Sequence, residues 1–390
     1  MDASLGGHGH GHGHGRAAPV GSAVVELGMR TRDAMIDSKQ RILGFDGLRA
    51  LAFLLVFISH KATSAASERY GTAGVWLFFV LSGFLITRIL ANHRADIEAG
   101  ISTVWASMKS FYLRRTLRIF PVYYLFLAVI TVLASYGALD LGSGLRQLSY
   151  WLYLGNIYIE FNDWGPVGHL WSLAVEEQFY LLFAPIALML PRKLLPLTCI
   201  SLILVSVAAH IALRYADAGD NHFDANSLVN FGLLGLGGLA GLAAERPLPR
   251  LLRSDVAIGL ALLVYLVAPA LMPKHQWVQV GRLAGLFAAL VLVQVYQRQT
   301  GSAVALLNWA PLRSLGVVSY GAYLFHPVIH CGAVLEALGY AGPAAQASGV
   351  LLDLVATVIL AGLSWRFFEA PVRSIAGRFT PSIREATPLP

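Results

Sequence analysis

The feature that most constrains this chain is a series of apolar stretches separated by short polar segments. Each stretch approaches the roughly 20 residues that an α-helix needs to cross the hydrocarbon core of a bilayer. Only 13% of the 390 residues are charged, whereas about 25% is usual in a soluble protein, so the chain cannot cover a water-facing surface. The sequence predicts an all-α polytopic membrane protein, a bundle of about ten transmembrane helices, within residues 43–60, 73–90, 119–136, 171–190, 194–213, 228–244, 256–272, 280–297, 314–335 and 348–368.

The positions of lysine and arginine predict which side of the membrane each segment faces. Basic loops are retained in the cytoplasm, and an even number of spans puts both termini on the same side. With the N-terminus inside, 22 of the 29 Lys and Arg residues fall in cytoplasmic segments or at the cytoplasmic ends of spans, and six in outside loops or at the outer ends of spans. We therefore expect both termini to be cytoplasmic. This placement also explains the net charge of +7 without a nucleic-acid partner, because the basic residues lie between apolar segments.

The order of polar and apolar segments predicts one membrane domain over residues 41–373, between two cytoplasmic tails at 1–40 and 374–390. The first tail is rich in glycine and begins with a His-Gly alternation from His8 to His14. We expect a disordered tail or a scar like an affinity tag, and weak metal binding is the alternative. No cleavable signal peptide precedes the first apolar stretch, which is therefore expected to remain as a helix.

Several other patterns predict structure and not chemistry. Cys199 and Cys331 lie within apolar stretches, so we expect buried free thiols and neither a disulfide nor a metal site. The glycine run over 235–241 matches a dinucleotide motif by letter, but that motif needs a preceding strand. Gly237 and Gly241, four residues apart, instead predict close packing between helices.

Two outside connections carry polar or aromatic clusters. We expect 214–227 to be a solvated loop and not a metal site, although its acidic residues and histidine suggest one at first sight. The longer connection, 137–170, is either an interfacial re-entrant segment or an aromatic platform for a sugar. The side chains concerned are Asp217, Asp220, His222 and Asp224 in the first connection, and Trp151, Tyr153, Tyr158 and Trp164 in the second.

Ionisable side chains within a span are costly, so they are functional candidates. The first span contains Arg49 and His60. Eleven helical positions return to nearly the same direction, so both side chains project from one face, about 16 Å apart along the axis. Histidine titrates near neutral pH and can accept a proton from a hydroxyl group. The alternative is that His60 only reaches the membrane interface beside Lys61.

Two further groups of charged residues suggest a site. Glu176 and Glu177 lie near the outer end of the fourth span, where one of them could orient His60 and the other face water; the alternative is that they only complement a helix dipole. A helical turn would gather Arg114, Arg115 and Arg118 into a patch that could grip phosphate oxygens. Retention of positive charge in the cytoplasm is the alternative there.

Six segments of the chain resemble, in order, the acyltransferase type 3 family of membrane O-acyltransferases. The resemblance runs from about residue 41 to 373, with mild departures: Ala50 stands where glycine is commoner and Ala174 where serine is common. The segments are Leu43 to His60, Gly74 to Ile86, Arg114 to Pro121, Trp171 to Tyr180, Ser319 to Pro327 and Phe368 to Pro371.

The resemblance implies a role for several of these side chains. The family's signature arginine and histidine on the first span correspond to Arg49 and His60, and its donor-binding arginine pair corresponds to Arg115 and Arg118. It implies an acyl-CoA donor, usually acetyl-CoA, on the cytoplasmic side of a bacterial inner membrane, with no tightly bound cofactor or metal. The acceptor would be a hydroxyl group of an exported or cell-surface carbohydrate, such as a lipopolysaccharide or exopolysaccharide. The length after the last span predicts a stand-alone member without a fused hydrolase-like domain.

The ninth span contributes the last candidates. His326 and His330 are expected one helical turn apart, but two nitrogens do not make a zinc site. We expect His326 to be structural or to face the acceptor, and Tyr323 and Trp171 are the other candidates that face it.

The prediction is therefore that Arg115, Arg118 and Arg49 hold the donor while His60 activates the acceptor or carries the acyl group itself. Either Glu176 or Glu177 would fix the tautomer of His60. The alternatives are a transporter or flippase for a lipid-linked sugar, for which charges within spans are equally expected, and a non-catalytic partner of polysaccharide-synthesis machinery.

Overall fold

A computed structural model of the chain describes residues 42–62, 65–215, 223–271 and 277–379. Within these ranges the chain forms helices and connecting segments and no β-strand, which confirms the all-α prediction. The predictions for the His-Gly tail and for Asp217, Asp220 and His222 lie outside the described residues.

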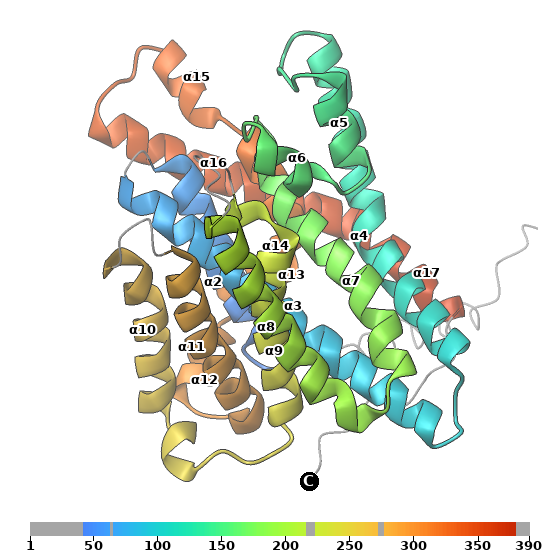
Figure 1. The fold of residues 1–390 in the computed structure, drawn as a ribbon. Coiled ribbons are helices and arrows are strands. Elements are labelled where there is room, and N and C mark those ends of the chain that lie inside the picture. The colour runs from blue at the N-terminus through green and yellow to red at the C-terminus, as the bar shows by residue number, and fades with distance from the viewer. Residues whose placement is uncertain (1–41, 63–64, 216–222, 272–276, 380–390) are drawn as a thin grey trace, which may run out of the picture. The chain divides into compact units, whose positions relative to one another are not determined.

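The helices follow the apolar stretches closely, because each stretch buries its backbone polar groups in hydrogen bonds along the helix. The third stretch is extended at its start, where the Thr103 side chain accepts from the amide of Ala106 and caps α4. The helices (Figure 1) are α2 (Phe45–Lys61), α3 (Ala65–Glu98), α4 (Val104–Ser135), α5 (Gly144–Trp151), α6 (Gly155–Phe161), α7 (Trp171–Met189), α8 (Leu195–Tyr215), α9 (Ser227–Ala243), α10 (Asp255–Leu271), α11 (Trp277–Arg298), α12 (Ser302–Leu307), α13 (Ala310–Val317), α14 (Ser319–Phe325), α15 (Cys331–Ala337), α16 (Pro343–Ser364) and α17 (Ala370–Phe379).

Five helical segments in the described ranges are long and apolar enough to cross a membrane. A sixth is possible if the two bent parts Ala310–Val317 and Ser319–Leu335 count as one span. The helices α2, α9 and α10 have 17 residues each, which is the lower limit of the length that crosses a bilayer. The chain is therefore a multi-pass integral membrane protein, while ten spans and the cytoplasmic position of the termini stay predictions.

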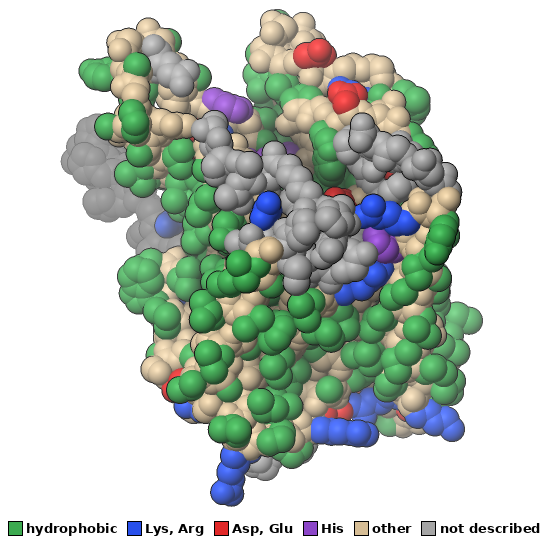
Figure 2. All heavy atoms as spheres, turned by 60° about the vertical axis from the view of Figure 1, so that its left-hand side comes forward, with side chains coloured by type: hydrophobic (Ala, Val, Ile, Leu, Met, Phe, Trp, Pro, Cys, Tyr) green, Lys and Arg blue, Asp and Glu red, His purple; other side chains and the backbone are tan. Residues whose placement is uncertain are grey.

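The surface of the described residues agrees with a lipid environment. Figure 2 shows hydrophobic side chains over much of one face and Lys and Arg side chains at its lower end. Large apolar side chains are exposed on several of the long helices, which a water-soluble monomer avoids over so wide an area. Examples are Val132 on α4, Leu181 on α7, Leu204 on α8 and Leu351 on α16.

The glycine run packs helices α3 and α9 closely together, as the sequence predicted. A Cβ atom at Gly237 would lie 2.1 Å from the carbonyl oxygen of Val80, and one at Gly83 would lie 2.0 Å from that of Leu234. Both distances are far below a van der Waals contact, so only glycine fits where these backbones meet. The contact fixes α3 in the centre of the bundle, between α2 and α9.

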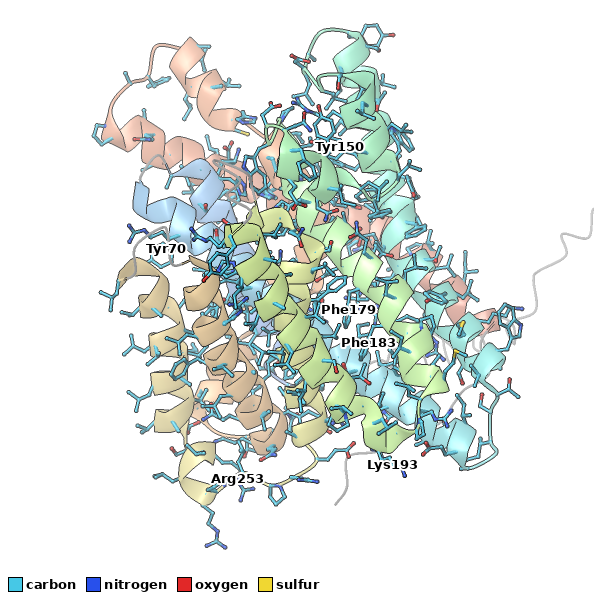
Figure 3. All side chains as sticks on the ribbon, viewed as in Figure 1. Tyr70, Tyr150, Phe179, Phe183, Lys193 and Arg253 are labelled. Atoms are coloured by element: carbon cyan, nitrogen blue, oxygen red, sulfur yellow. The ribbon has the colours of Figure 1, made fainter. Side chains whose placement is uncertain are left out.

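The connection between α4 and α7 folds back as the short helices α5 and α6, at the same end of the bundle as α15 (Figure 1). The ring of Tyr153 stacks on Tyr123 of α4 at 4.2 Å between centroids, and Trp151 stacks on Tyr124 at 5.7 Å. These two aromatic side chains therefore anchor the connection to α4 and do not form an open sugar platform. Figure 3 places Lys193 and Arg253 at the opposite end.

The two cysteines differ in burial. Cys199 is buried and Cys331 is half-buried, and both are free thiols. The predicted free state is confirmed, and the predicted burial holds for Cys199 only.

Candidate functional site

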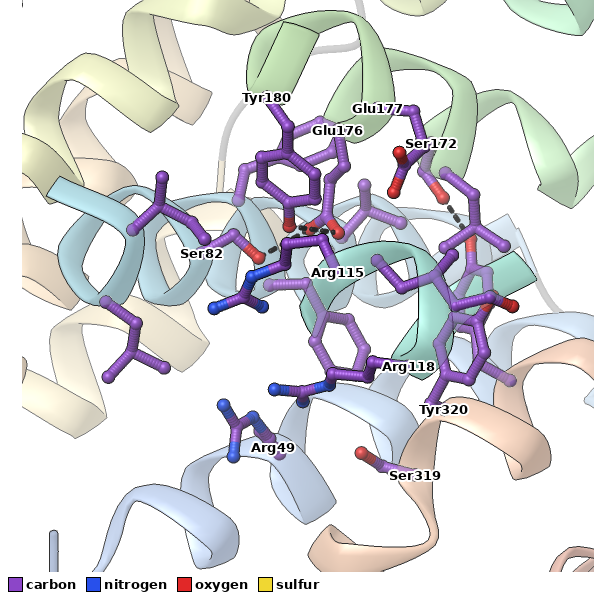
Figure 4. A pocket seen from close by; sticks show the side chains of 18 residues that line it. Arg49, Ser82, Arg115, Arg118, Ser172, Glu176, Glu177, Tyr180, Ser319 and Tyr320 are labelled. Atoms are coloured by element: carbon purple, nitrogen blue, oxygen red, sulfur yellow. Dashed lines mark hydrogen bonds between the residues drawn. The ribbon is translucent and has the colours of Figure 1, made fainter. Parts of the chain in front are cut away.

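A cavity lies in the middle of the bundle, among side chains from α2, α3, α4, α7 and α14 (Figure 4). It contains about 830 Å³ of space that no atom fills, part of it open to solvent. Its charged and polar lining residues are Arg49, Ser82, Arg115, Arg118, Ser172, Glu176, Glu177, Tyr180, Ser319, Tyr320 and Tyr323. All three arginines predicted to hold a donor therefore line one cavity, although they come from two helices far apart in the sequence.

Two of these arginines belong to α4, where a three-residue spacing puts them on neighbouring positions of one face. The guanidinium of Arg115 lies 5.9 Å from the ring of Phe111 and 5.7 Å from that of Tyr180, so aromatic faces support it. Within the described residues, neither Arg115 nor Arg118 forms an ion pair with a carboxylate. Arg114, the third member of the predicted patch, does not line the cavity.

The third arginine reaches the cavity from α2. Its Nη1 atom lies 3.0 Å from Oδ1 of Asp46, one turn earlier on the same helix. This pair partly neutralises Arg49 and holds its side chain against the helix. The cavity thus combines one paired guanidinium with two that are available to an anion.

The two glutamates lie with the arginines and not with His60. Oε1 of Glu176 accepts a hydrogen bond from Ser82 at 2.7 Å, and Oε2 accepts one from Tyr180 at 3.0 Å. Oε1 of Glu177 is buried and has no hydrogen-bond partner in the described ranges. The expectation that one of them fixes the tautomer of His60 is therefore wrong for this structure, because α7 turns both carboxyl groups into the cavity.

The position of His60 is set by a second histidine. Nδ1 of His60 lies 3.0 Å from the carbonyl oxygen of Val56 and 3.2 Å from Nε2 of His326. Nδ1 of His326 lies 2.8 Å from the carbonyl oxygen of Tyr323 and must donate to it, so Nε2 of His326 is an acceptor. The hydrogen of His60 is therefore on Nδ1, which leaves Nε2 with a free lone pair.

The predicted ninth span is broken at His326. The regular helix ends there in a turn of 3₁₀-helix over His326–Val328, and a separate bend of 64° lies earlier, between Ala310–Val317 and Ser319–Leu335. His326 is fully buried, whereas His330 is exposed. The expectation that the two histidines share one helical face is wrong, because Pro327 interrupts the regular helix between them.

A buried ion pair fixes the end of α2 to this break. Nζ of Lys61 lies 2.9 Å from Oδ2 of Asp353 on α16 and also donates to the carbonyl oxygen of Ile329. Oδ1 of Asp353 accepts from the amide of Cys331 at 2.5 Å. The pair therefore joins three segments around His60 and His326. Lys61 has this structural role and is not a free cation at the membrane interface.

Tyr323 and Ser172 form the wall between the cavity and the histidines. The hydroxyl of Tyr323 lies 2.7 Å from Oγ of Ser172 and donates to the carbonyl oxygen of His169 at 3.0 Å. The ring of Tyr323 lies 5.6 Å from that of His326. Two of the residues predicted to face an acceptor, Tyr323 and His326, therefore lie between the arginine-lined cavity and His60. Trp171 packs on Phe79 at 5.8 Å and borders a separate small cavity.

The sequence did not single out His169, which the structure places in the same cluster. Its ring lies 5.5 Å from that of His326 and 5.6 Å from that of Tyr323. The only signal available was its position two residues before Trp171, at the edge of a segment that resembles the family. Within the described ranges no group of three or more His, Cys, Asp or Glu side chains is placed to hold a metal ion.

Comparison with known proteins identifies the family of the chain. Residues 42–366 match the family described as acyltransferase domain. The chain is 31% identical to YrhL of Bacillus subtilis over 85% of its length, and 28% identical over 86% of its length both to the peptidoglycan O-acetyltransferase OatA of Listeria monocytogenes and to the O-acetyltransferase OatA of Staphylococcus aureus. It spans 55%, 56% and 58% of these three relatives, respectively. No solved structure matches the chain significantly.

Proposed function

Because the chain belongs to the type 3 acyltransferase family over residues 42–366, we propose that it is a membrane O-acetyltransferase. It transfers an acetyl group from cytoplasmic acetyl-CoA to a hydroxyl group of a carbohydrate outside the membrane. The observation that carries the proposal is the cavity lined by three arginines, which borders the cluster of His60 and His326 at Tyr323 and Ser172.

The arginines suit an anionic donor. Coenzyme A carries phosphate groups, and guanidinium groups bind phosphate oxygens through paired hydrogen bonds. Arg115 and Arg118 have no carboxylate partner in the described part of the chain, so their charge is available to such a ligand. We propose that they hold the phosphates near the cytoplasmic end while the thioester extends toward Tyr323.

The exposure of His60 and the free lone pair on its Nε2 allow it to activate the acceptor hydroxyl group. Its Nε2 carries a lone pair, since Nδ1 donates to Val56 and His326, and it is therefore able to take the proton of an attacking hydroxyl group. His60 is exposed, so a large acceptor can reach it. The same lone pair also allows His60 to attack the thioester itself and to carry the acetyl group.

A relative suggests the acceptor, and the basic loops suggest how the protein is oriented in the membrane. The Listeria relative is a peptidoglycan O-acetyltransferase, which makes peptidoglycan the first acceptor to test, ahead of lipopolysaccharide and exopolysaccharide. Basic loops such as those with Lys193 and Arg253 lie at one end of the bundle (Figure 3), which supports a cytoplasmic position for that end. We place the protein in the bacterial inner membrane with His60 toward the outside.

The test is acetyl transfer by the purified protein in lipid nanodiscs, with radiolabelled acetyl-CoA and peptidoglycan fragments as acceptor. We expect labelled acceptor and free CoA from the wild type and a loss of both with His60→Ala. The exposed His330→Ala serves as the matched control, because His330 lies outside the histidine cluster. Transfer that is unchanged in His60→Ala would refute the catalytic role of His60.

The same experiment separates the rival functions. A transporter or flippase of a lipid-linked sugar would release no CoA, and neither would a non-catalytic partner of a polysaccharide synthase. Label that stays on the wild-type protein without an acceptor, and is absent from His60→Ala, would support an acetyl-histidine intermediate over direct transfer.

A further inference from the structure

His169 is a buried histidine whose ring has no hydrogen-bond partner in the described residues. It is 6% exposed, and neither Nδ1 nor Nε2 forms a hydrogen bond. The carbonyl group of Leu324 lies near the ring, but not in hydrogen-bonding geometry. Buried polar groups are normally satisfied, so an unsatisfied ring at this place requires an explanation.

The local structure holds this ring beside Tyr323 and His326, at 5.6 Å and 5.5 Å between ring centroids. His169 lies in the 3₁₀ turn Gly168–Leu170, directly before α7. Its backbone carbonyl accepts from the Tyr323 hydroxyl at 3.0 Å and from Ser172 at 3.2 Å. The backbone of His169 is thus part of the boundary between the arginine-lined cavity and the histidines. Its ring lies behind that boundary, on the side of the histidines.

The ring shares His326 with His60. The centroid of the His326 ring lies 4.9 Å from that of His60 and 5.5 Å from that of His169. Both ring nitrogens of His326 are hydrogen-bonded, to Tyr323 and to His60, so neither is available to a ligand. His60 offers a lone pair at Nε2, and a neutral His169 always carries one N–H group. The cluster therefore presents an acceptor and a donor from two separate rings.

We propose that His169 is a further catalytic residue, whose N–H group donates to the carbonyl oxygen of the donor's thioester. This inference rests on the proposed function. As the acceptor oxygen attacks the carbonyl carbon, its proton passes to Nε2 of His60, and the new C–O bond forms. Negative charge gathers on the carbonyl oxygen, where the His169 N–H stabilises it. The C–S bond then breaks, and the CoA thiolate leaves and takes up the proton.

The same donor serves if His60 attacks first, because the carbonyl oxygen gains charge in that step as well. A preorganised N–H group in a water-poor site needs no rearrangement during the reaction, which is why such donors are effective. Because neither nitrogen of His169 has a hydrogen-bond partner in the described residues, its N–H group is available as such a donor. A histidine with only a structural role would be hydrogen-bonded to its surroundings.

The test measures how the thioester carbonyl is bound, so it does not depend on knowing the acceptor. Acetyl-CoA with a ¹³C carbonyl is bound to the wild type in nanodiscs, and its carbonyl stretch is recorded by isotope-edited infrared spectroscopy. We expect a shift to lower frequency, which is lost in His169→Phe. His169→Asn and His169→Gln keep an amide N–H near the positions of Nδ1 and Nε2, and the one that restores the shift identifies the donating nitrogen.

A second measurement uses S-ethyl-CoA, which lacks the carbonyl oxygen. Wild type should bind acetyl-CoA more tightly than S-ethyl-CoA, and His169→Phe should bind both equally. In acetyl transfer we expect kcat to fall about 100- to 1,000-fold in His169→Phe, as for other lost oxyanion donors, and KM for acetyl-CoA to rise only by the factor by which its binding preference over S-ethyl-CoA is lost. His210→Phe replaces another buried histidine, on α8, and should leave carbonyl frequency and kcat unchanged.

The outcomes distinguish the two proposals. If the wild type binds no acetyl-CoA and transfers no acetyl group, the proposed function fails. If the wild type does both, and His169→Phe keeps the carbonyl shift and the preference over S-ethyl-CoA, the role of His169 is refuted. Should His169→Phe fail to fold, His169→Asn and His169→Gln decide the question, because an unshifted carbonyl in wild type and in both variants also refutes it.

Discussion

Replacing Asp353 by asparagine should strongly destabilise the protein, because it leaves the positive charge of Lys61 buried without a counter-charge. The side chains of Lys61 and Asp353 are only 5% and 7% exposed, and the charged atoms are 2.9 Å apart. Water therefore does little to screen either charge. Asparagine keeps the shape of the side chain and an oxygen for the amide of Cys331, so the change isolates the charge.

The expected loss is about 3–5 kcal/mol of unfolding free energy, the usual cost of removing one partner from a buried pair. Replacing both partners by apolar residues, as Lys61→Met with Asp353→Leu, should recover much of this loss, because no uncompensated charge remains. The exposed pair of Arg192 and Glu245, whose side chains are 39% and 44% exposed, offers a matched control. Glu245→Gln should cost about 0–1 kcal/mol.

The measurement is helix loss by circular dichroism in mixed dodecyl maltoside and SDS micelles, with the unfolding free energy compared among the four proteins. Because Lys61 adjoins His60 and the pair also holds Ile329 and Cys331 after His326, acetyl transfer should fall in Asp353→Asn as well. A loss below about 1 kcal/mol for Asp353→Asn, similar to that of Glu245→Gln, would contradict the proposed importance of the buried charge.

Two further predictions follow from the cavity and from the helix packing. Arg115→Ala and Arg118→Ala should each raise KM for acetyl-CoA about 10- to 100-fold, in line with the loss of about 1.5–3 kcal/mol for a charged hydrogen bond. Lys109→Ala, at an exposed site on the same helix, should leave KM unchanged. Equal effects of all three variants in initial-rate assays would exclude phosphate binding in the cavity. Gly237→Ala should cost about 1–3 kcal/mol of unfolding free energy because its Cβ would lie 2.1 Å from a backbone oxygen. Gly259→Ala, whose Cβ meets nothing within 4 Å, should not destabilise α10, and a similar loss for both variants would show that close approach is not the cause.

Helix positions and membrane character were largely readable from the sequence. Apolar stretches of nearly the length of a bilayer crossing leave few alternatives to a helix, because every backbone polar group must be satisfied within the segment. The same holds for Arg49 and His60, whose spacing puts them on one face of α2, and for Gly237, whose spacing from Gly241 predicted close packing. All of these depend on residues near one another along the chain.

The contacts between the helices were not readable in this way. The sequence paired the glutamates with His60, whereas α7 turns Glu176 toward Ser82 and Tyr180. It also treated residues 314–335 as one span and so stacked His326 on His330. The break at Pro327 instead brings His326 to His60, 266 residues apart in the sequence.

The sequence by itself determined that the chain is helical, spans a membrane more than once and carries rare charges within its apolar stretches. Periodicity decides which side chains share a face of one helix, and composition decides which faces lie against lipid. Only the tertiary structure decided that the arginines and glutamates share one cavity, and that His60, His169 and His326 meet behind its wall. The physical reason is that distances between helices depend on packing at glycines, on a broken span and on a buried ion pair, none of which has a fixed spacing along the chain.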